Sequence, residues 1–250
     1  MNCKVLIPYI TATWPSLEEC LQILKVYDRY GDIIELGIPT DNPKYDGPTI
    51  RMTHREAEQR GLQALCTVLE SYRTCKPVMV LTYLEDHINN LEKFFQTISE
   101  YSAVRTVLFP DLLFDYYDMV EKYVELCRKY NIEPSFFIST KFPYNLAKEL
   151  TKYRPFLIYM GAQAATGIEL PIYVERNVKI FRQILQNVRF VVGFAISRKT
   201  QVEKLLELNV DGIVIGTELV KRYKVGKLEA VEEFLKEIRE VLDRADISKT

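Results

Sequence analysis

The most regular feature of this 250-residue chain is an alternation of two hydrophobic patterns. Short runs rich in Val, Ile and Leu are typical of strands buried on both faces, whereas apolar residues spaced three or four positions apart are typical of amphipathic helices. The apolar runs predict strands at Val5–Thr11, Ile33–Ile38, Val78–Tyr83, Thr106–Phe109, Pro134–Ile138, Phe156–Met160, Phe190–Ala195 and Gly212–Ile215.

A helical pattern follows each predicted strand. The first helix is expected to begin after Ser16, because Glu19 stands three residues later at the spacing of a capping box. The others are predicted at about 49–74, 91–98, 117–130, 145–153, 172–186, 199–208 and 228–245. Eight strand–helix units in a chain of this length predict an α/β fold, a closed (β/α)8 TIM barrel forming a single domain over residues 1–250.

An open doubly wound sheet is the alternative architecture. It is disfavoured because Thr11-Ala12-Thr13-Trp14-Pro15 follows the first predicted strand, where such folds carry a glycine-rich dinucleotide loop. Trp14 could be a packing residue or a pocket wall, and the sequence does not decide between these.

Composition narrows the class of protein. The net charge of -1 gives no reason to expect nucleic acid or a membrane surface as a partner. No apolar run reaches the roughly 18 residues of a membrane span, and the N-terminus lacks the pattern of a signal peptide. The five cysteines include no CxxC pair, which favours reduced thiols in a cytoplasmic protein.

No metal site is predicted. His54 and His87 are the only two histidines, and neither has metal-ligand spacing to a cysteine. Both lie in helical or helix-entry segments, so we expect them to be solvated surface residues.

Two carboxylates are the strongest candidates for chemistry. Glu35 interrupts the apolar run Ile33–Ile38, and Asp46 follows in a loop marked by Asn42-Pro43 and Gly47-Pro48. A buried Glu without a partner is costly, so its presence indicates a function, although it could also sit at an edge or pair with a buried Arg. In a barrel both acids would lie at the C-terminal ends of the strands, where Tyr9, Tyr83 and Asp111 are also expected. Asp111 could position the Asp46 loop, contact a partner, or simply be a turn or cap residue before the following helix.

Three glycine-containing segments near the last strands could hold a phosphate. Small residues let backbone N–H groups approach an anion, and a helix beginning near Gly216 would direct its N-terminus at it. The segments are Ala164–Gly167, Gly193–Ser197 and Gly216–Leu219.

These motifs resemble the alpha subunit of tryptophan synthase, and are most similar to its short archaeal members. The resemblance spans nearly the whole chain in the right order. It rests on Glu35–Pro39 with Asp46–Ile50, and on Ile7–Thr11, Phe109–Leu112, Thr166-Gly167, Val192–Ser197 and Asp211–Thr217.

The resemblance implies a lyase that cleaves indole-3-glycerol phosphate into indole and glyceraldehyde 3-phosphate by a retro-aldol reaction. Glu35 would be the acid/base that protonates indole C3, and Asp46 would accept a hydrogen bond from the indole N–H. Further substrate contacts are implied for Tyr9, Leu81 and Tyr83 in the indole pocket, for Tyr159 as an ambiguous match to a family tyrosine, and for Thr166, Gly167, Gly193, Ala195, Gly216 and Thr217 at the phosphate.

The resemblance also implies a partner. This chain would need no cofactor, while a beta subunit carrying pyridoxal phosphate would receive the indole, with the Asp46 loop and the loop after strand six near the interface. The chain departs from the family by lacking the extra N-terminal helix of many members and by its altered sequence at Gly161–Gly167. That altered loop leaves open a second function, a weakly active regulatory subunit that activates the beta subunit.

Overall fold

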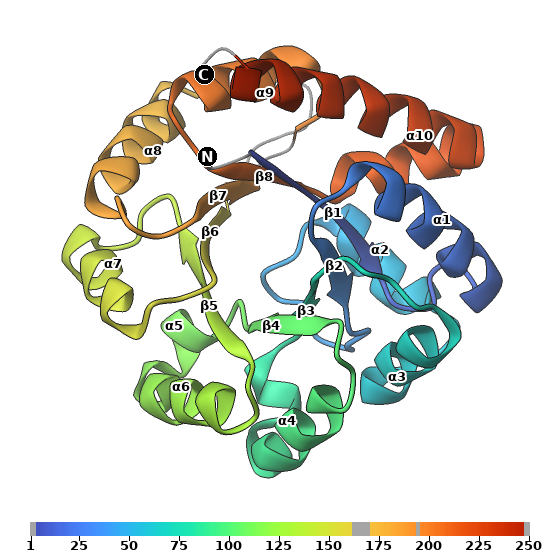
Figure 1. Cartoon of the computed structure of the whole chain (residues 1–250). Coiled ribbons are helices and arrows are strands. Elements are labelled where there is room, and N and C mark those ends of the chain that lie inside the picture. Colours follow the sequence, from blue (N-terminus) through green and yellow to red (C-terminus); the bar gives the residue numbers. More distant parts are fainter. Residues whose placement is uncertain (1–3, 162–170, 194–195, 248–250) are drawn as a thin grey trace.

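The computed structural model describes residues 4–161, 171–193 and 196–247, and its strands form a closed parallel barrel (Figure 1). Each strand pairs with its neighbours in chain order, and the last strand closes onto the first. The strands are β1 (Val5–Thr11), β2 (Ile34–Gly37), β3 (Val78–Leu81), β4 (Val104–Leu108), β5 (Glu133–Ser139), β6 (Leu157–Gly161), β7 (Phe190–Gly193) and β8 (Gly212–Ile215). The predicted (β/α)8 fold is confirmed, whereas the single domain over residues 1–250 stays a prediction.

The helices form a ring around the barrel (Figure 1). They are α1 (Leu17–Tyr30), α2 (Pro48–Glu56), α3 (Gly61–Ser71), α4 (Leu91–Ser99), α5 (Leu112–Asp115), α6 (Val120–Lys129), α7 (Tyr144–Leu150), α8 (Ile172–Ile184), α9 (Lys199–Glu207) and α10 (Thr217–Ile247). Short 3₁₀ turns lie at Leu84–Asp86, Ile88–Asn90, Tyr117–Met119 and Thr151–Tyr153. The predicted cap of α1 is confirmed, since Ser16 Oγ accepts a hydrogen bond from Glu19 N at 3.2 Å.

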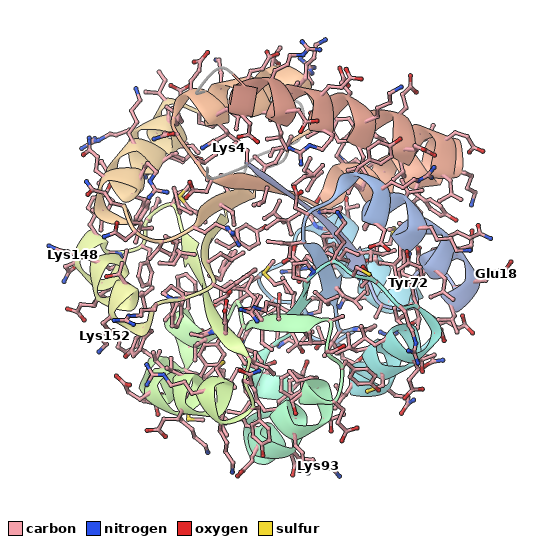
Figure 2. All side chains as sticks on the ribbon, in the orientation of Figure 1. Lys4, Glu18, Tyr72, Lys93, Lys148 and Lys152 are labelled. Atoms are coloured by element: carbon pink, nitrogen blue, oxygen red, sulfur yellow. The ribbon has the colours of Figure 1, made fainter. Side chains whose placement is uncertain are left out.

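Burial explains why the strands read as continuous apolar runs. All seven residues of β1 are buried, because one face fills the barrel and the other packs against the helices. Charged residues lie on the outer faces of the helices, as Lys93, Lys148 and Lys152 show (Figure 2). Among the helices of the described ranges, none is both long and apolar enough to cross a membrane.

One predicted helix is two helices. The segment 49–74 divides into α2 and α3, with a break between Glu56 and Gly61. In the break, Glu58 N donates to Thr13 O at 3.1 Å, and Gly61 takes a left-handed φ of 58°. The break lies in Glu-Ala-Glu-Gln-Arg, all residues that tolerate a helix, so tertiary hydrogen bonds override local propensity here.

The C-terminal helix begins earlier than predicted. α10 starts at Thr217, directly after β8, and its backbone is non-helical only at Gly226 and Lys227. The segment between β8 and the predicted start of this helix is helical up to Val225. Tyr223 itself is buried and meets Trp14 edge-on, with ring centroids 5.6 Å apart. Trp14 is therefore a packing residue between the β1–α1 connection and α10.

Tyr123 on α6 joins two strands through one buried hydroxyl. Its Oη donates to Val107 O at 2.7 Å and accepts from Ser135 N at 2.8 Å. We predict that Tyr123→Phe lowers the free energy of unfolding by about 1–3 kcal/mol, because it removes a buried partner from both backbone groups. Denaturant unfolding measures this loss.

Tyr117→Phe is the matched control, because the Tyr117 side chain is 45% exposed. It should change the free energy of unfolding by less than about 0.5 kcal/mol. Equal losses in the two variants would show that the buried hydroxyl has no special role.

Candidate functional site

Glu35 presents a buried carboxyl inside the barrel. It lies in the middle of β2, opposite Tyr9 of β1 and Met79 of β3, and is 1% exposed. Its Oε1 has no hydrogen-bond partner among the described residues. Burial, and then the negative charge of Asp46, raise the pKa of Glu35 well above its usual value. Such a carboxyl keeps its proton to a higher pH than an exposed Glu does, which suits it to act as a general acid.

Asp46 lies beyond the end of β2 and is held by a tyrosine. Tyr83 Oη donates to Asp46 Oδ2 at 2.7 Å and accepts from Tyr45 N at 3.1 Å. Burial raises the pKa of Asp46 to about 6, against the opposing effects of the Tyr83 hydrogen bond and the Arg51 charge. Asp46 is therefore ionised at neutral pH and able to accept a hydrogen bond.

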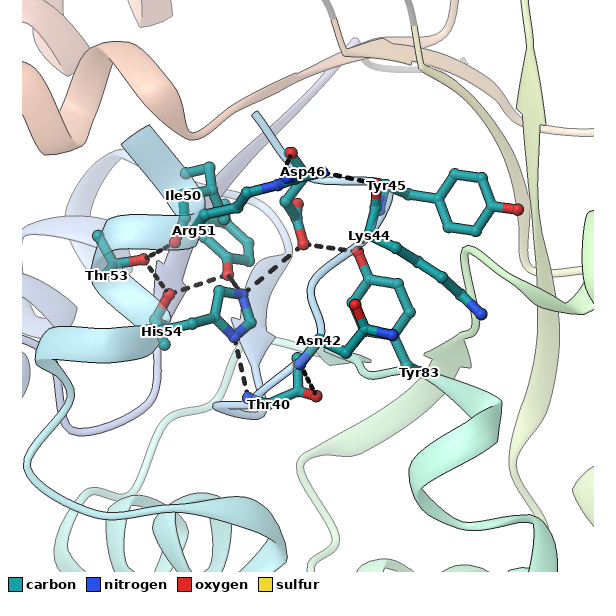
Figure 3. A network of polar contacts seen from close by, with 12 residues as sticks. Thr40, Asn42, Lys44, Tyr45, Asp46, Ile50, Arg51, Thr53, His54 and Tyr83 are labelled. Atoms are coloured by element: carbon teal, nitrogen blue, oxygen red, sulfur yellow. Dashed lines mark hydrogen bonds and ion pairs between the residues drawn. The ribbon is translucent and has the colours of Figure 1, made fainter. Parts of the chain in front are cut away.

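The loop that carries Asp46 is fixed by ionic contacts. Lys44 Nζ lies 2.5 Å from Glu85 Oε2 and 2.7 Å from Asp115 Oδ2, so one ammonium joins the segments after β3 and β4. Tyr45 Oη donates to Asp115 Oδ1 at 2.9 Å. Arg51 Nε donates to the Asp46 carbonyl at 2.8 Å. These contacts tie the loop to the segments that follow β3 and β4. Figure 3 shows Lys44, Tyr45 and Asp46 on this loop and Arg51 on α2.

Asp111 caps the turn after β3. Its two carboxylate oxygens accept from Leu84 N at 2.8 Å and Glu85 N at 3.1 Å. Because Glu85 also binds Lys44, Asp111 supports the Asp46 loop indirectly. The Asp111 side chain makes no cap hydrogen bond to α5, the helix that follows it, so its contacts favour the alternative in which it positions the Asp46 loop.

His54 is a site residue that the sequence analysis missed. It is fully buried on α2, so the prediction of a solvated surface residue is wrong. Its Nδ1 accepts from Thr40 N at 3.0 Å, while Nε2 lies 3.4 Å from Tyr9 Oη and 3.7 Å from Asp46 Oδ2. Figure 3 shows His54 and Tyr83 on opposite sides of Asp46. The spacing of His54 from Ile50 and Thr53 put it on the inward face of the helix, which was the available signal.

The expectation that His87 is a solvated surface residue is also wrong. Its ring is half-buried and stacks on Phe94 with centroids 4.2 Å apart, and its Nε2 lies 2.9 Å from Thr82 Oγ1. Burial lowers the pKa of His87 to about 4, so the ring is neutral at pH 7.

Aromatic rings lie close to glycines around the two acids. A Cβ on Gly37 would meet Tyr9 Oη at 2.4 Å, and one on Gly193 would meet Tyr159 Oη at 2.1 Å. Both glycines therefore make room for a tyrosine. Leu81, at the end of β3, pairs with Gly37 and is 6% exposed, so the structure brings it beside Tyr9.

Part of the predicted phosphate site can be placed. Gly193 ends β7, and Gly216 precedes Thr217, the first residue of α10, at the same end of the barrel. A Cβ on Gly216 would lie 3.1 Å from the Tyr9 ring. Thr166, Gly167 and Ala195 lie outside the described residues.

Some backbone N–H groups near the predicted phosphate site are already engaged. Ser197 N and Arg198 N donate to Gln201 Oε1 at 2.8 and 3.2 Å. In the described part of the chain, no group of three or more His, Cys, Asp or Glu side chains could hold a metal ion.

Burying Glu35 lowers the stability of the folded protein at pH values above the pKa that this residue has in the unfolded chain. A carboxyl whose pKa is raised on folding lowers stability as pH rises from its unfolded value of about 4.5 through its folded pKa. We predict that Glu35→Gln raises the free energy of unfolding by about 1–2 kcal/mol at pH 8. The gain should shrink as pH falls toward 5.

Denaturant unfolding of both proteins at pH 5 and pH 8 measures this difference. Glu92→Gln is the control, because Glu92 is an exposed residue paired with Lys129. A gain for Glu35→Gln that is the same at both pH values would contradict the raised pKa.

Comparison with known proteins identifies the family. The family described as tryptophan synthase alpha chain matches residues 1–246. The tryptophan synthase alpha chain of Sulfurisphaera tokodaii is 32% identical over 243 residues, covering 96% of this chain and 98% of that protein. The Saccharolobus solfataricus alpha chain is 30% identical over 96% of this chain and 97% of its own length.

Solved structures agree with this result. The tryptophan synthase complex from Pyrococcus furiosus contains a chain that superposes with a TM-score of 0.83 at 27% identity, covering 96% of this chain and 98% of that one. The tryptophan synthase A-subunit of the same organism gives a TM-score of 0.85, also at 27% identity, over 97% of this chain and 99% of that one. The chain therefore belongs to the tryptophan synthase alpha chain family, the lyases that cleave indole-3-glycerol phosphate in tryptophan biosynthesis.

Proposed function

We propose that Glu35 and Asp46 carry out the retro-aldol cleavage of indole-3-glycerol phosphate in this chain. The observation that supports this best is the buried Glu35 carboxyl, whose Oε1 lacks a partner among the described residues and whose pKa is raised beside Asp46. Protonation of an aromatic carbon needs an acid that still holds its proton at neutral pH, and this environment provides one.

In the proposed reaction Glu35 moves two protons. The carboxyl gives its proton to indole C3, which places a positive charge on the ring, and Asp46 accepts the indole N–H and stabilises that charge. The Glu35 carboxylate then takes the proton of the side-chain hydroxyl next to the ring. The bond from C3 to the side chain breaks, its electrons return to the ring, and the hydroxyl carbon becomes the aldehyde. Indole and glyceraldehyde 3-phosphate leave, and Glu35 is again protonated.

The remaining predicted residues are assigned to binding. Tyr9, Leu81 and Tyr83 would form the indole pocket, with Tyr159 over Gly193. Gly193, Gly216 and Thr217 would bind phosphate through their backbone N–H groups, aided by the positive end of α10. Thr166, Gly167 and Ala195 complete the proposed phosphate site from outside the described residues.

A beta subunit is the proposed partner. The family uses no cofactor in this subunit, and pyridoxal phosphate resides in the beta subunit. The Pyrococcus furiosus tryptophan synthase complex supports a similar assembly for this chain. The family resemblance implies that the loop carrying Asp46 and the loop after β6 would lie near the interface. The sequence favours neither nucleic acid nor membrane as a partner, and the cytoplasmic location stays a prediction.

The central test is indole release from indole-3-glycerol phosphate, measured with and without the beta subunit. We predict that Glu35→Gln lowers kcat by at least about 100-fold, because the amide cannot supply the proton. Asp46→Asn should lower kcat by about 10-fold or more, because it keeps an acceptor but loses the charge.

Glu92→Gln again serves as the matched control, and it should retain wild-type turnover. Indole release that persists in Glu35→Gln would remove Glu35 as the acid. If the wild-type protein binds glycerol phosphate but gives no turnover under either condition, the regulatory alternative replaces the active lyase.

A further inference from the structure

We propose that His54 is a positioning residue that holds Asp46 in its ionised form through an Nε2–H group. The inference rests on the proposed role of Asp46 and adds a residue to the reaction. It is carried by the tautomer of the ring and by the direction of the hydrogen bonds around it.

The tautomer of His54 follows from its partner on the other ring nitrogen. Thr40 N donates to Nδ1 at 3.0 Å, so Nδ1 must be an acceptor. A neutral imidazole with an acceptor at Nδ1 carries its proton on Nε2. Burial, with a smaller effect of the Arg60 charge, lowers the pKa of His54 to about 4, so the ring stays neutral at pH 7.

Tyr9 Oη does not donate a hydrogen bond to His54. Thr53 Oγ1 donates to Ile50 O at 2.8 Å, so in its 2.6 Å contact with Thr11 Oγ1 it must accept. Thr11 Oγ1 therefore donates to Thr53 Oγ1, and Tyr9 Oη donates to Thr11 Oγ1 at 2.9 Å. Each hydroxyl has one proton to donate, so in this series of hydrogen bonds each donor is on the Tyr9 side and each acceptor is on the α2 side.

The Nε2–H group of His54 thus has two oxygens near it. Tyr9 Oη is 3.4 Å away and Asp46 Oδ2 is 3.7 Å away, both longer than a strong hydrogen bond. Catalytic hydrogen bonds are often long in the absence of substrate and shorten when it binds. An N–H dipole whose positive end lies near a carboxylate favours the ionised form of that carboxylate.

The other groups that face Asp46 act with or against this dipole. Tyr83, just after β3, donates a hydrogen bond, Arg51 from α2 adds positive charge, and Glu35 from β2 is a second acid. Tyr9 of β1 and Tyr159 of β6 also feel the Asp46 charge. Removing the His54 N–H leaves these groups in place, so the pKa of Asp46 should rise.

Two substitutions separate the two nitrogens of the ring. Gln places its amide nitrogen at the reach of Nε2, whereas Asn reaches only the position of Nδ1. We predict that His54→Asn moves the acidic midpoint of kcat/KM upward by at least about 0.5 pH unit, while His54→Gln leaves it within about 0.2. The loss of kcat/KM in His54→Asn should accordingly be larger at pH 6 than at pH 8.

The contrary results are equally specific. Equal losses at all pH values in both variants, or a midpoint that moves in His54→Gln but not in His54→Asn, would overturn the proposal in favour of a structural role through Thr40. His87→Asn is the matched control, because His87 is also a neutral histidine but contacts Thr82 and Phe94 instead of the site. It should not move the midpoint.

A second measurement does not require turnover. A pH titration of the Asp46 carboxyl carbon by NMR should give a higher pKa in His54→Asn than in the wild type, and ¹⁵N shifts should report Nε2–H for wild-type His54 between pH 6 and 8. An unchanged Asp46 pKa, or a proton on Nδ1, would overturn the proposal even if the wild type were inactive. An inactive wild type with a raised Asp46 pKa in His54→Asn would instead refute the lyase assignment alone.

Discussion

The organisation of this site depends on keeping one carboxyl buried beside another. Glu35 lies on β2 with 1% exposure, and Asp46 lies close enough that its charge raises the pKa of Glu35. Two adjacent acids in a dry environment do not both ionise readily, so one remains a proton donor while the other carries the charge. The surrounding residues decide which acid takes which role.

The division of roles comes from unequal hydrogen bonding. Asp46 receives the Tyr83 hydroxyl and faces His54 and Arg51, all of which favour its anion. Glu35 lies between Tyr9 and Met79 of the neighbouring strands and has no described partner at Oε1. This environment destabilises the folded protein and is retained where chemistry needs it, which is a common conflict between stability and function.

The loop that carries Asp46 is held in place by contacts to the segments that follow β3 and β4. Lys44 connects it to residues after β3 and β4, Tyr45 stacks near Tyr83 with ring centroids 6.4 Å apart, and Asp111 fixes the turn to which Lys44 binds. A loop held by contacts to neighbouring loops can be shifted by anything that binds those loops. The proposed coupling to a beta subunit therefore has a physical basis in this chain.

Sequence alone determined the barrel, the place of Glu35 on its second strand and of Asp46 in the loop that follows, and the family. Hydrophobic periodicity, strand length and the order of motifs can be read from the sequence without knowledge of tertiary contacts. Sequence did not reveal the break between α2 and α3, where the N–H groups of Glu58 and Gly61 bond to residues distant in the chain. It also misplaced His54, because the burial of a polar helix residue depends on what packs over it. Only the tertiary structure brought Thr40, Tyr9 and Asp46 around that ring, and with them the proton positions that distinguish the two acids.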